Sequence, residues 1–90
     1  MSTQQYVLVG EIGLARGTYG PAIRWSEPMD RASVDAFLAE VVAGRERDFF
    51  KRDDDALVLR MSADQYLVVE RHGRRPQSLA RFTVAEVVAS

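Results

Sequence analysis

One segment of the chain carries an apolar face at helical spacing. Apolar residues recur at positions i, i+3, i+4, i+7 and i+8, which fall on one side of a helix: Val34, Phe37, Leu38, Val41 and Val42. Asp30 can accept hydrogen bonds from the unpaired N–H groups of a first helical turn, and Gly44 can adopt the left-handed conformation that ends many helices. The pattern predicts a helix over residues 31–43 that packs this face on another apolar surface.

Segments with alternating side chains lie on both sides of the predicted helix. A period of two predicts strands at residues 6–15, 22–27, 56–61 and 66–71. Residues 62–65 have the length of a hairpin turn. Residues 79–82 are expected to form a weaker strand, and the capping-box spacing from Thr83 to Glu86 predicts a short helix over residues 84–89.

The order of these elements indicates an α+β fold in a single domain, residues 1–90. Because hairpins pair antiparallel strands, we expect a mostly antiparallel sheet with the main helix on one face. A β-grasp-like sheet and a sheet of two hairpins side by side both satisfy the order β-β-α-β-β, followed by a weak strand and a short helix. Trp25 shares a strand face with Ile23, and we expect Trp25 to lie in the core.

The composition excludes some kinds of site and indicates where in the cell the protein is found. The absence of cysteine excludes disulfides and zinc sites built on thiolates. No apolar run approaches the roughly 20 residues of a membrane span, and residues 1–5 lack the features of a secretory signal. We therefore expect a cytoplasmic protein with no membrane partner. Eleven of the twelve basic residues are arginine, which is typical of a GC-rich bacterial or phage genome.

The length of the chain favours association. A chain of 90 residues buries only roughly 60–65 % of the surface that its unfolded form exposes, so its core is small. Strand edges and a small core both favour pairing with a second copy. We therefore expect a homodimer.

Four glycines near the first strand invite comparison with phosphate-binding loops: Gly10, Gly13, Gly17 and Gly20. Such loops need a helix N-terminus directly after the glycines. Pro21 and an alternating strand follow here instead. The glycines are therefore interpreted as bulge and turn residues, and we predict no cofactor.

Catalytic and metal-binding groups are sparse. His72 is the only histidine, and no nucleophile or orienting group accompanies it in the sequence. Asp53, Asp54 and Asp55 could bind a cation through oxygen, but the EF-hand spacing is missing. We interpret His72 as a turn residue and the aspartates as a solvated turn that protects a sheet edge, and predict no metal.

A group of four arginines offers the best basic surface: Arg71, Arg74, Arg75 and Arg81. No acidic residue lies between positions 71 and 81. The group could contact phosphates or an acidic partner. The formal net charge of −1 argues against bulk attraction to nucleic acid, so any such binding is expected to be weak and sensitive to salt.

The connector after the predicted helix, residues 45–55, is charged at nine of its eleven positions. Its two uncharged residues are Phe49 and Phe50. Because adjacent residues of an extended segment point to opposite sides, we expect one ring to be buried and the other exposed. An exposed ring with Arg47, Lys51 and Arg52 around it would resemble an aromatic anchor with a polar rim. We therefore predict a partner-binding site at these five residues. The alternative is that the two phenylalanines straddle the helix and sheet layers.

These observations favour a small non-enzymatic protein that binds another macromolecule, most simply a protein. Adaptors, inhibitors and immunity-type proteins have this size and composition. The first alternative is a nucleic-acid-binding or regulatory module that uses the four arginines. The second is a small enzyme without a metal, although nothing in the sequence places its acid and base together.

Overall fold

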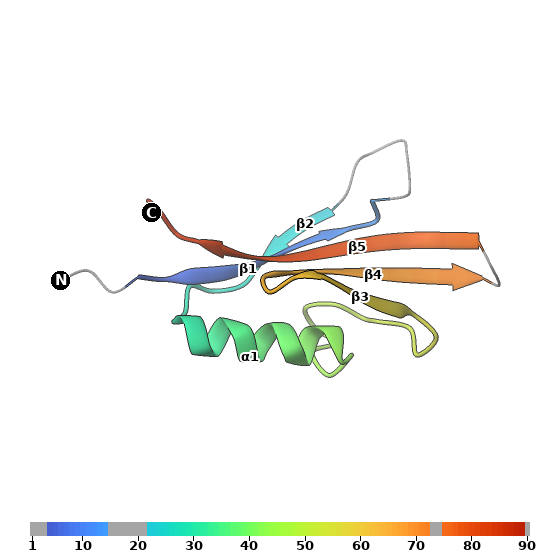
Figure 1. Ribbon diagram of the computed structural model, residues 1–90, viewed down its shortest axis with the longest axis horizontal. Helices are drawn as coiled ribbons and strands as arrows, with labels where there is room; N and C mark the ends of the chain where they lie inside the picture. Colours follow the sequence, from blue (N-terminus) through green and yellow to red (C-terminus); the bar gives the residue numbers. More distant parts are fainter. Residues whose placement is uncertain (1–3, 15–21, 73–74, 90) are drawn as a thin grey trace.

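The protein folds as a five-stranded antiparallel sheet with a helix packed on one face (Figure 1). The computed structural model describes residues 4–14, 22–72 and 75–89. The elements are, in chain order, β1 (Tyr6–Ile12), β2 (Ala22–Trp25), α1 (Arg31–Val42), β3 (Leu57–Ser62), β4 (Gln65–His72) and β5 (Arg75–Glu86). The predicted α+β fold is confirmed.

The strand order across the sheet is β2-β1-β5-β4-β3. β1 pairs with β2, and β3 pairs with β4, so each of the two expected hairpins forms. The hairpins do not touch each other, because β5 lies between them and pairs with both β1 and β4. Of the two arrangements left open above, the sheet is closer to the pair of hairpins, with the last strand inserted at its centre.

The predicted C-terminal helix over residues 84–89 is wrong. β5 runs to Glu86, with Val84 opposite Leu8 and Glu86 opposite Tyr6 on β1. Val84 also donates its backbone N–H to the Asp64 carbonyl oxygen at 2.8 Å. A capping box offers a few local hydrogen bonds, whereas the ladder to β1 pairs every residue from Thr83 to Glu86, where the helix would begin, so the segment forms a strand.

The main helix begins and ends where the sequence predicts. Asp30 accepts a hydrogen bond from the Ser33 backbone N–H at 2.7 Å and caps the N-terminus. At the other end, Gly44 has φ +82°, and the Arg45 N–H donates to the Glu40 carbonyl at 2.9 Å. These two features form the left-handed stop that glycine permits.

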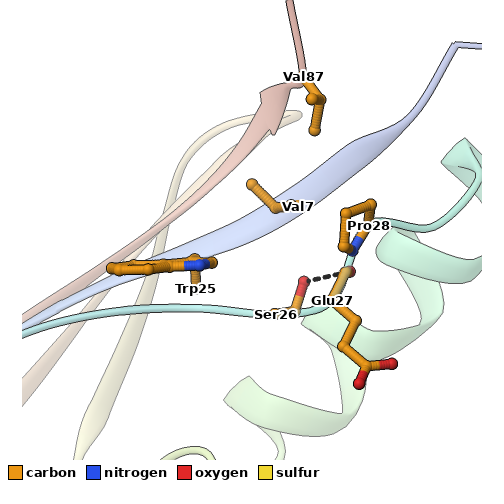
Figure 2. Close-up of a pocket in the computed structure, with 6 residues that line it drawn as sticks. All are labelled: Val7, Trp25, Ser26, Glu27, Pro28 and Val87. Atoms are coloured by element: carbon orange, nitrogen blue, oxygen red, sulfur yellow. Dashed lines mark hydrogen bonds between the residues drawn. The ribbon is translucent and has the colours of Figure 1, made fainter. Parts of the chain in front are cut away.

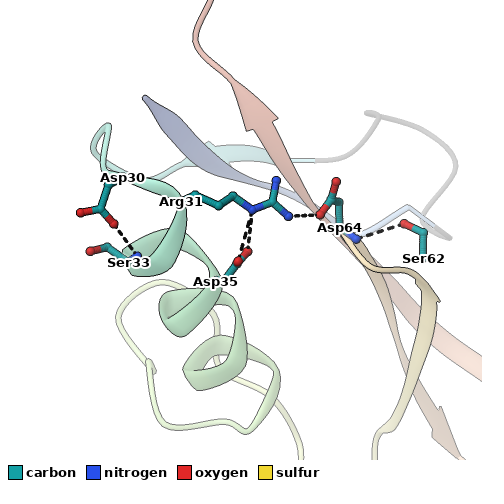
Figure 3. Close-up of polar contacts among 6 residues, drawn as sticks. All are labelled: Asp30, Arg31, Ser33, Asp35, Ser62 and Asp64. Atoms are coloured by element: carbon teal, nitrogen blue, oxygen red, sulfur yellow. Dashed lines mark hydrogen bonds and ion pairs between the residues drawn. The ribbon is translucent and has the colours of Figure 1, made fainter. Parts of the chain in front are cut away.

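Arg31 ties the start of α1 to the turn between β3 and β4 (Figure 3). Its guanidinium pairs with Asp35 one turn along the helix and with Asp64 in that turn. The turn itself is held by a hydrogen bond from the Asp64 N–H to Ser62 Oγ at 3.2 Å. These contacts place the helix start at one end of the β3–β4 hairpin.

The core lies between α1 and the sheet. Val34, Leu38 and Val41 of the helix are buried, and Phe37 and Val42 pack on the cluster from its margin. The sheet contributes Leu8, Val68, Ala80, Phe82 and Val84. Phe82 is fully buried, and a Cβ added at Gly10 would lie only 3.0 Å from its ring. Gly10 therefore allows the close approach of Phe82 to β1. Within a strand, a glycine indicates either a bulge or a close approach of this kind.

Candidate functional site

The sheet has a second face, opposite the helix, which we call the open face. Side chains alternate between the two faces of a strand, so the residues between the core positions point to it. The register assigns ten apolar residues to this face: Val7, Val9, Ile23, Trp25, Leu57, Leu59, Leu67, Val69, Leu79 and Ala85. No element packs on this face within the ranges that the structure describes.

The apolar residues form two patches. The tryptophan patch consists of Trp25 and Ile23 on β2 with Val7 and Val9 on β1, and Ala85 on β5 borders it. The leucine patch consists of Leu57, Leu59, Leu67, Val69 and Leu79 on β3, β4 and β5. Between them runs a polar strip of Glu11, Arg81, Thr83 and Gln65. The open face is thus mostly apolar with a polar centre.

Trp25 is the most prominent member of the open face. The expectation that it lies in the core is wrong, because 66 % of its surface is exposed. Its neighbour Ile23 is 58 % exposed. Trp25 sits opposite Val9, whose side chain points away from the helix, whereas the adjacent Leu8 points into the core. The alternation on β2 identified the shared face correctly, but that face is the one without a helix.

A hollow of about 410 Å³ lies beside Trp25 (Figure 2). Val7, Pro28 and Val87 line it together with Trp25, Ser26 and Glu27. Its floor is fixed by Ser26, whose buried hydroxyl accepts from the Leu8 N–H at 2.9 Å and donates to the Glu27 carbonyl at 3.1 Å. An apolar side chain of a partner could therefore insert between Trp25 and Pro28.

A second hollow of about 430 Å³ borders Trp25 at the edge of β2, next to the connector. It is lined by Ile23, Arg24, Trp25, Asp48 and Phe49. Arg24 Nη1 donates to the Asp48 carbonyl at 2.9 Å and to the Phe49 carbonyl at 2.8 Å, which holds the connector against the end of β2. Trp25 thus borders two surface hollows.

Glu11 and Arg81 form the centre of the polar strip. Arg81 Nε donates to Glu11 Oε1 at 2.8 Å and Arg81 Nη2 donates to Oε2 at 2.7 Å, a two-pronged pairing of a planar guanidinium with a carboxylate. The hydrogen bonds from Arg81 hold the pKa of Glu11 below its ordinary value of 4.5, against an opposing effect of desolvation. The strip therefore carries two charges that neutralise each other.

This pairing should make stability depend on pH. Because the pKa of Glu11 is lower in the folded state, the pair stabilises the fold above about pH 4.5 and loses this effect as pH falls through the lowered pKa. We expect Glu11→Gln to flatten that part of the stability profile. Urea unfolding of parent and variant at pH 7 and at several values below 4.5 would measure it. Parallel profiles for the two proteins would contradict the assignment.

The arginine group predicted as a basic surface is only partly described. Arg71 is exposed, and Arg81 is paired with Glu11 across the sheet. Arg74 lies outside the described residues, and of Arg75 only the backbone pairing with His72 is described. Arg81 therefore offers less positive charge to a phosphate than its sequence context indicates.

The connector places Phe49 and Phe50 differently from the extended segment that was expected. Both backbone N–H groups donate to the Glu46 carbonyl, at 3.1 and 2.9 Å, so the chain turns at this point. Both rings consequently reach Phe82, with centroid distances of 6.3 Å for Phe49 and 4.9 Å for Phe50. Phe50 is 6 % exposed and Phe49 is half-buried, so Phe50 is not an exposed anchor.

The three basic residues of the connector separate into two groups. Arg47 and Lys51 are exposed. Arg52 packs beside Gly44 and donates from Nη2 to the Ala43 carbonyl at 3.3 Å, which places a positive charge at the C-terminal end of α1. A partner-binding role for the connector stays a prediction.

The remaining candidates are the three aspartates, the glycines near β1 and His72. Asp53, Asp54 and Asp55 are exposed, and no group of three or more potential ligands is placed to hold a metal ion in the described part of the chain. Gly13 has φ +84° and acts as a turn residue, whereas Gly17, Gly20 and the His72 side chain lie outside what the structure describes.

Sequence reasoning missed the open face, although a signal for it exists. Leu57-Val58-Leu59 and Tyr66-Leu67-Val68-Val69 are apolar at consecutive positions, and such runs are typical of strands whose two faces are both covered. Comparison with known protein families, curated proteins and solved structures found no match. Among the described residues, no helix has both the length and the apolar character needed to cross a membrane.

Proposed function

We propose that this protein is a non-enzymatic interaction module that binds another protein through its open face. The observation that carries the proposal is the exposure of Trp25, 66 %, on a sheet face with apolar residues from all five strands. Extended apolar patches on a folded domain are typical of interaction sites.

The composition of the face supports a protein as the partner. Tryptophan is enriched among the residues that contribute most to protein–protein binding, above all where it fills or borders a recess. Trp25 borders two hollows. The Glu11–Arg81 pair adds polar specificity without a net charge that would need compensation. An adaptor, an inhibitor or an immunity-type protein would use such a surface.

The nucleic-acid alternative receives less support. A nucleic-acid-binding module would rely on Arg71, Arg74, Arg75 and Arg81, and Arg81 is neutralised by Glu11. The connector residues Arg47 and Lys51 could form part of the rim of a protein interface, beside the recess that Phe49 and Trp25 share. A cytoplasmic location and a bacterial or phage origin complete the proposal.

If Trp25 is an anchor, its replacement by alanine should weaken binding of the partner by about 2 kcal/mol or more, which raises Kd roughly 30-fold. Because Trp25 is mostly exposed, the variant should keep the fold. The matched control is Val88→Ala, at an apolar position that is 88 % exposed and lies beyond β5.

The measurement is a pull-down from native cell extract with parent, variant and control, followed by titration of the captured partner. Equal binding by all three proteins would contradict the proposal. Capture of nucleic acid with nanomolar affinity at physiological salt would favour the nucleic-acid alternative instead.

A further inference from the structure

We infer that the partner of the open face is a second copy of this chain, bound face to face about a two-fold axis. The inference rests on the proposed function, because it names the occupant of the same surface. The two sheets would form the inner layers of the dimer, about 10 Å apart, and the two helices its outer layers.

The symmetry of the sheet supports this arrangement. β5 is the central strand, with two strands on each side, and it carries Arg81 and Thr83 of the polar strip. The strip crosses the sheet diagonally, because Glu11 lies opposite Arg81 on one rung and Thr83 lies opposite Gln65 on the next. A two-fold axis in the plane of the face, at right angles to the strip, therefore places the polar strip of one copy on the polar strip of the other. The same operation places the tryptophan patch on the tryptophan patch of the other copy and the leucine patch on the leucine patch. Such self-complementarity is what a two-fold interface requires.

The charges of the open face are compatible with pairing between identical copies. Glu11 and Arg81 cancel within each copy, so the two faces do not repel each other. At the centre of the dimer the two pairs would form a neutral group of four charges, in which each pair faces Thr83 and Gln65 of the other copy. A partner with an apolar surface alone would leave this pair buried without new polar contacts.

The size of the face also fits a second copy. Five strands at a spacing of about 4.8 Å, with a mean length of about seven residues, make a face of roughly 24 by 24 Å. Its projected area is roughly 600 Å², and the corrugated surface of the side chains is larger. A stable interface takes about 800 Å² from each partner, so most of the open face must be covered. A second open face presents an equal area, so each face can cover most of the other.

A matched pair of substitutions on β3 tests the geometry. Leu59 and Val58 are adjacent and similarly exposed, at 41 % and 37 %. Leu59 pairs with Leu67 on the open face, whereas Val58 pairs with Val68 on the helix side. Leu59→Arg should raise the dissociation constant of the dimer roughly 100-fold or more, because it buries an unpaired charge, and Val58→Arg should leave it unchanged.

The measurement is sedimentation velocity of the full chain from low to high micromolar concentration, with circular dichroism to verify the fold of each variant. The inference is supported if the parent and Val58→Arg sediment as a species of twice 10.1 kDa and Leu59→Arg sediments as a species of 10.1 kDa. If Leu59→Arg does not fold, Ile23→Arg on the opposite edge decides, because Ile23 is 58 % exposed and belongs to the tryptophan patch.

Three results would overturn the inference. A parent that stays at 10.1 kDa at every concentration excludes the second copy. Dissociation by both β3 variants indicates pairing through the free edge of β3, and dissociation by neither places the interface elsewhere. If the inference fails but Trp25→Ala binds a captured partner more weakly than the parent does, the proposed function stands. The proposed function fails separately, if that variant binds the partner as the parent does.

Discussion

Replacing Val68 with aspartate should largely unfold the protein, whereas the same replacement at Val69 should leave it folded. The two residues are neighbours on β4, but their side chains point to opposite faces. Val68 is fully buried between Val58 and Ala80, under the helix. Val69 pairs with Leu57 and Leu79 on the open face and remains partly exposed.

The difference follows from the environment of the carboxylate. At position 68 it would be buried without a partner, which costs about 3–5 kcal/mol, and the valine packing would also be lost. A domain of 90 residues has a total stability of about 4–14 kcal/mol, so the penalty is a large part of it. At position 69 the carboxylate can reach water from the open face.

Far-UV circular dichroism and urea unfolding of both variants would measure this prediction. Val69→Asp should retain the far-UV spectrum of the parent but should not form the dimer inferred above. The variants and the parent should therefore be compared at low concentration, where a dimer does not affect the comparison. A folded Val68→Asp variant together with an unfolded Val69→Asp variant would mean that the core lies on the other face of the sheet.

Replacement of Phe82 by alanine should lower the free energy of unfolding by about 3–5 kcal/mol. Phe82 is fully buried at the point where the sheet meets the connector, and its ring packs on those of Phe49 and Phe50. Its ring also fills the space above Gly10, where no side chain is present. Removal of the ring therefore leaves a cavity with walls from three segments, none of which can collapse into it alone.

The control for this prediction is Phe49→Ala. Phe49 is half-buried and packs edge-on against Phe37 at a centroid distance of 5.1 Å. Phe49→Ala should lower the free energy of unfolding clearly less than Phe82→Ala does, because solvent already reaches part of the Phe49 ring. Urea denaturation of the two variants and the parent compares the costs. Equal losses would show that Phe49 is as central to the core as Phe82.

Features with local causes were predictable from the sequence. The start of α1 depends on Asp30 and the N–H of Ser33, and its end depends on Gly44, all within one turn of the helix itself. The hairpin turn between β3 and β4 likewise lies where residues 62–65 predict it. Such signals act between residues a few positions apart, so they are visible in the amino-acid order alone.

Features that depend on strand pairing were not predictable in the same way. The capping-box residues Thr83 and Glu86 lie in β5, because β1 offers the whole segment a ladder and β4 pairs with Thr83. Phe49 and Phe50 both reach Phe82, because the connector turns at Glu46 instead of extending. In the first case a non-local ladder outweighs a local preference. In the second, a local turn of the backbone replaces the extended segment that was expected.

The candidate site shows the same division. Alternation along β2 determined that Ile23 and Trp25 share a face, but the position of the helix decided that this face is the open one. Glu11 and Arg81 are 70 positions apart and meet only because β5 pairs with β1. The sequence by itself determined the helix, the hairpins and the sets of residues that point the same way. Only the tertiary structure decided which set is covered and which is exposed, because that choice depends on long-range packing and strand order.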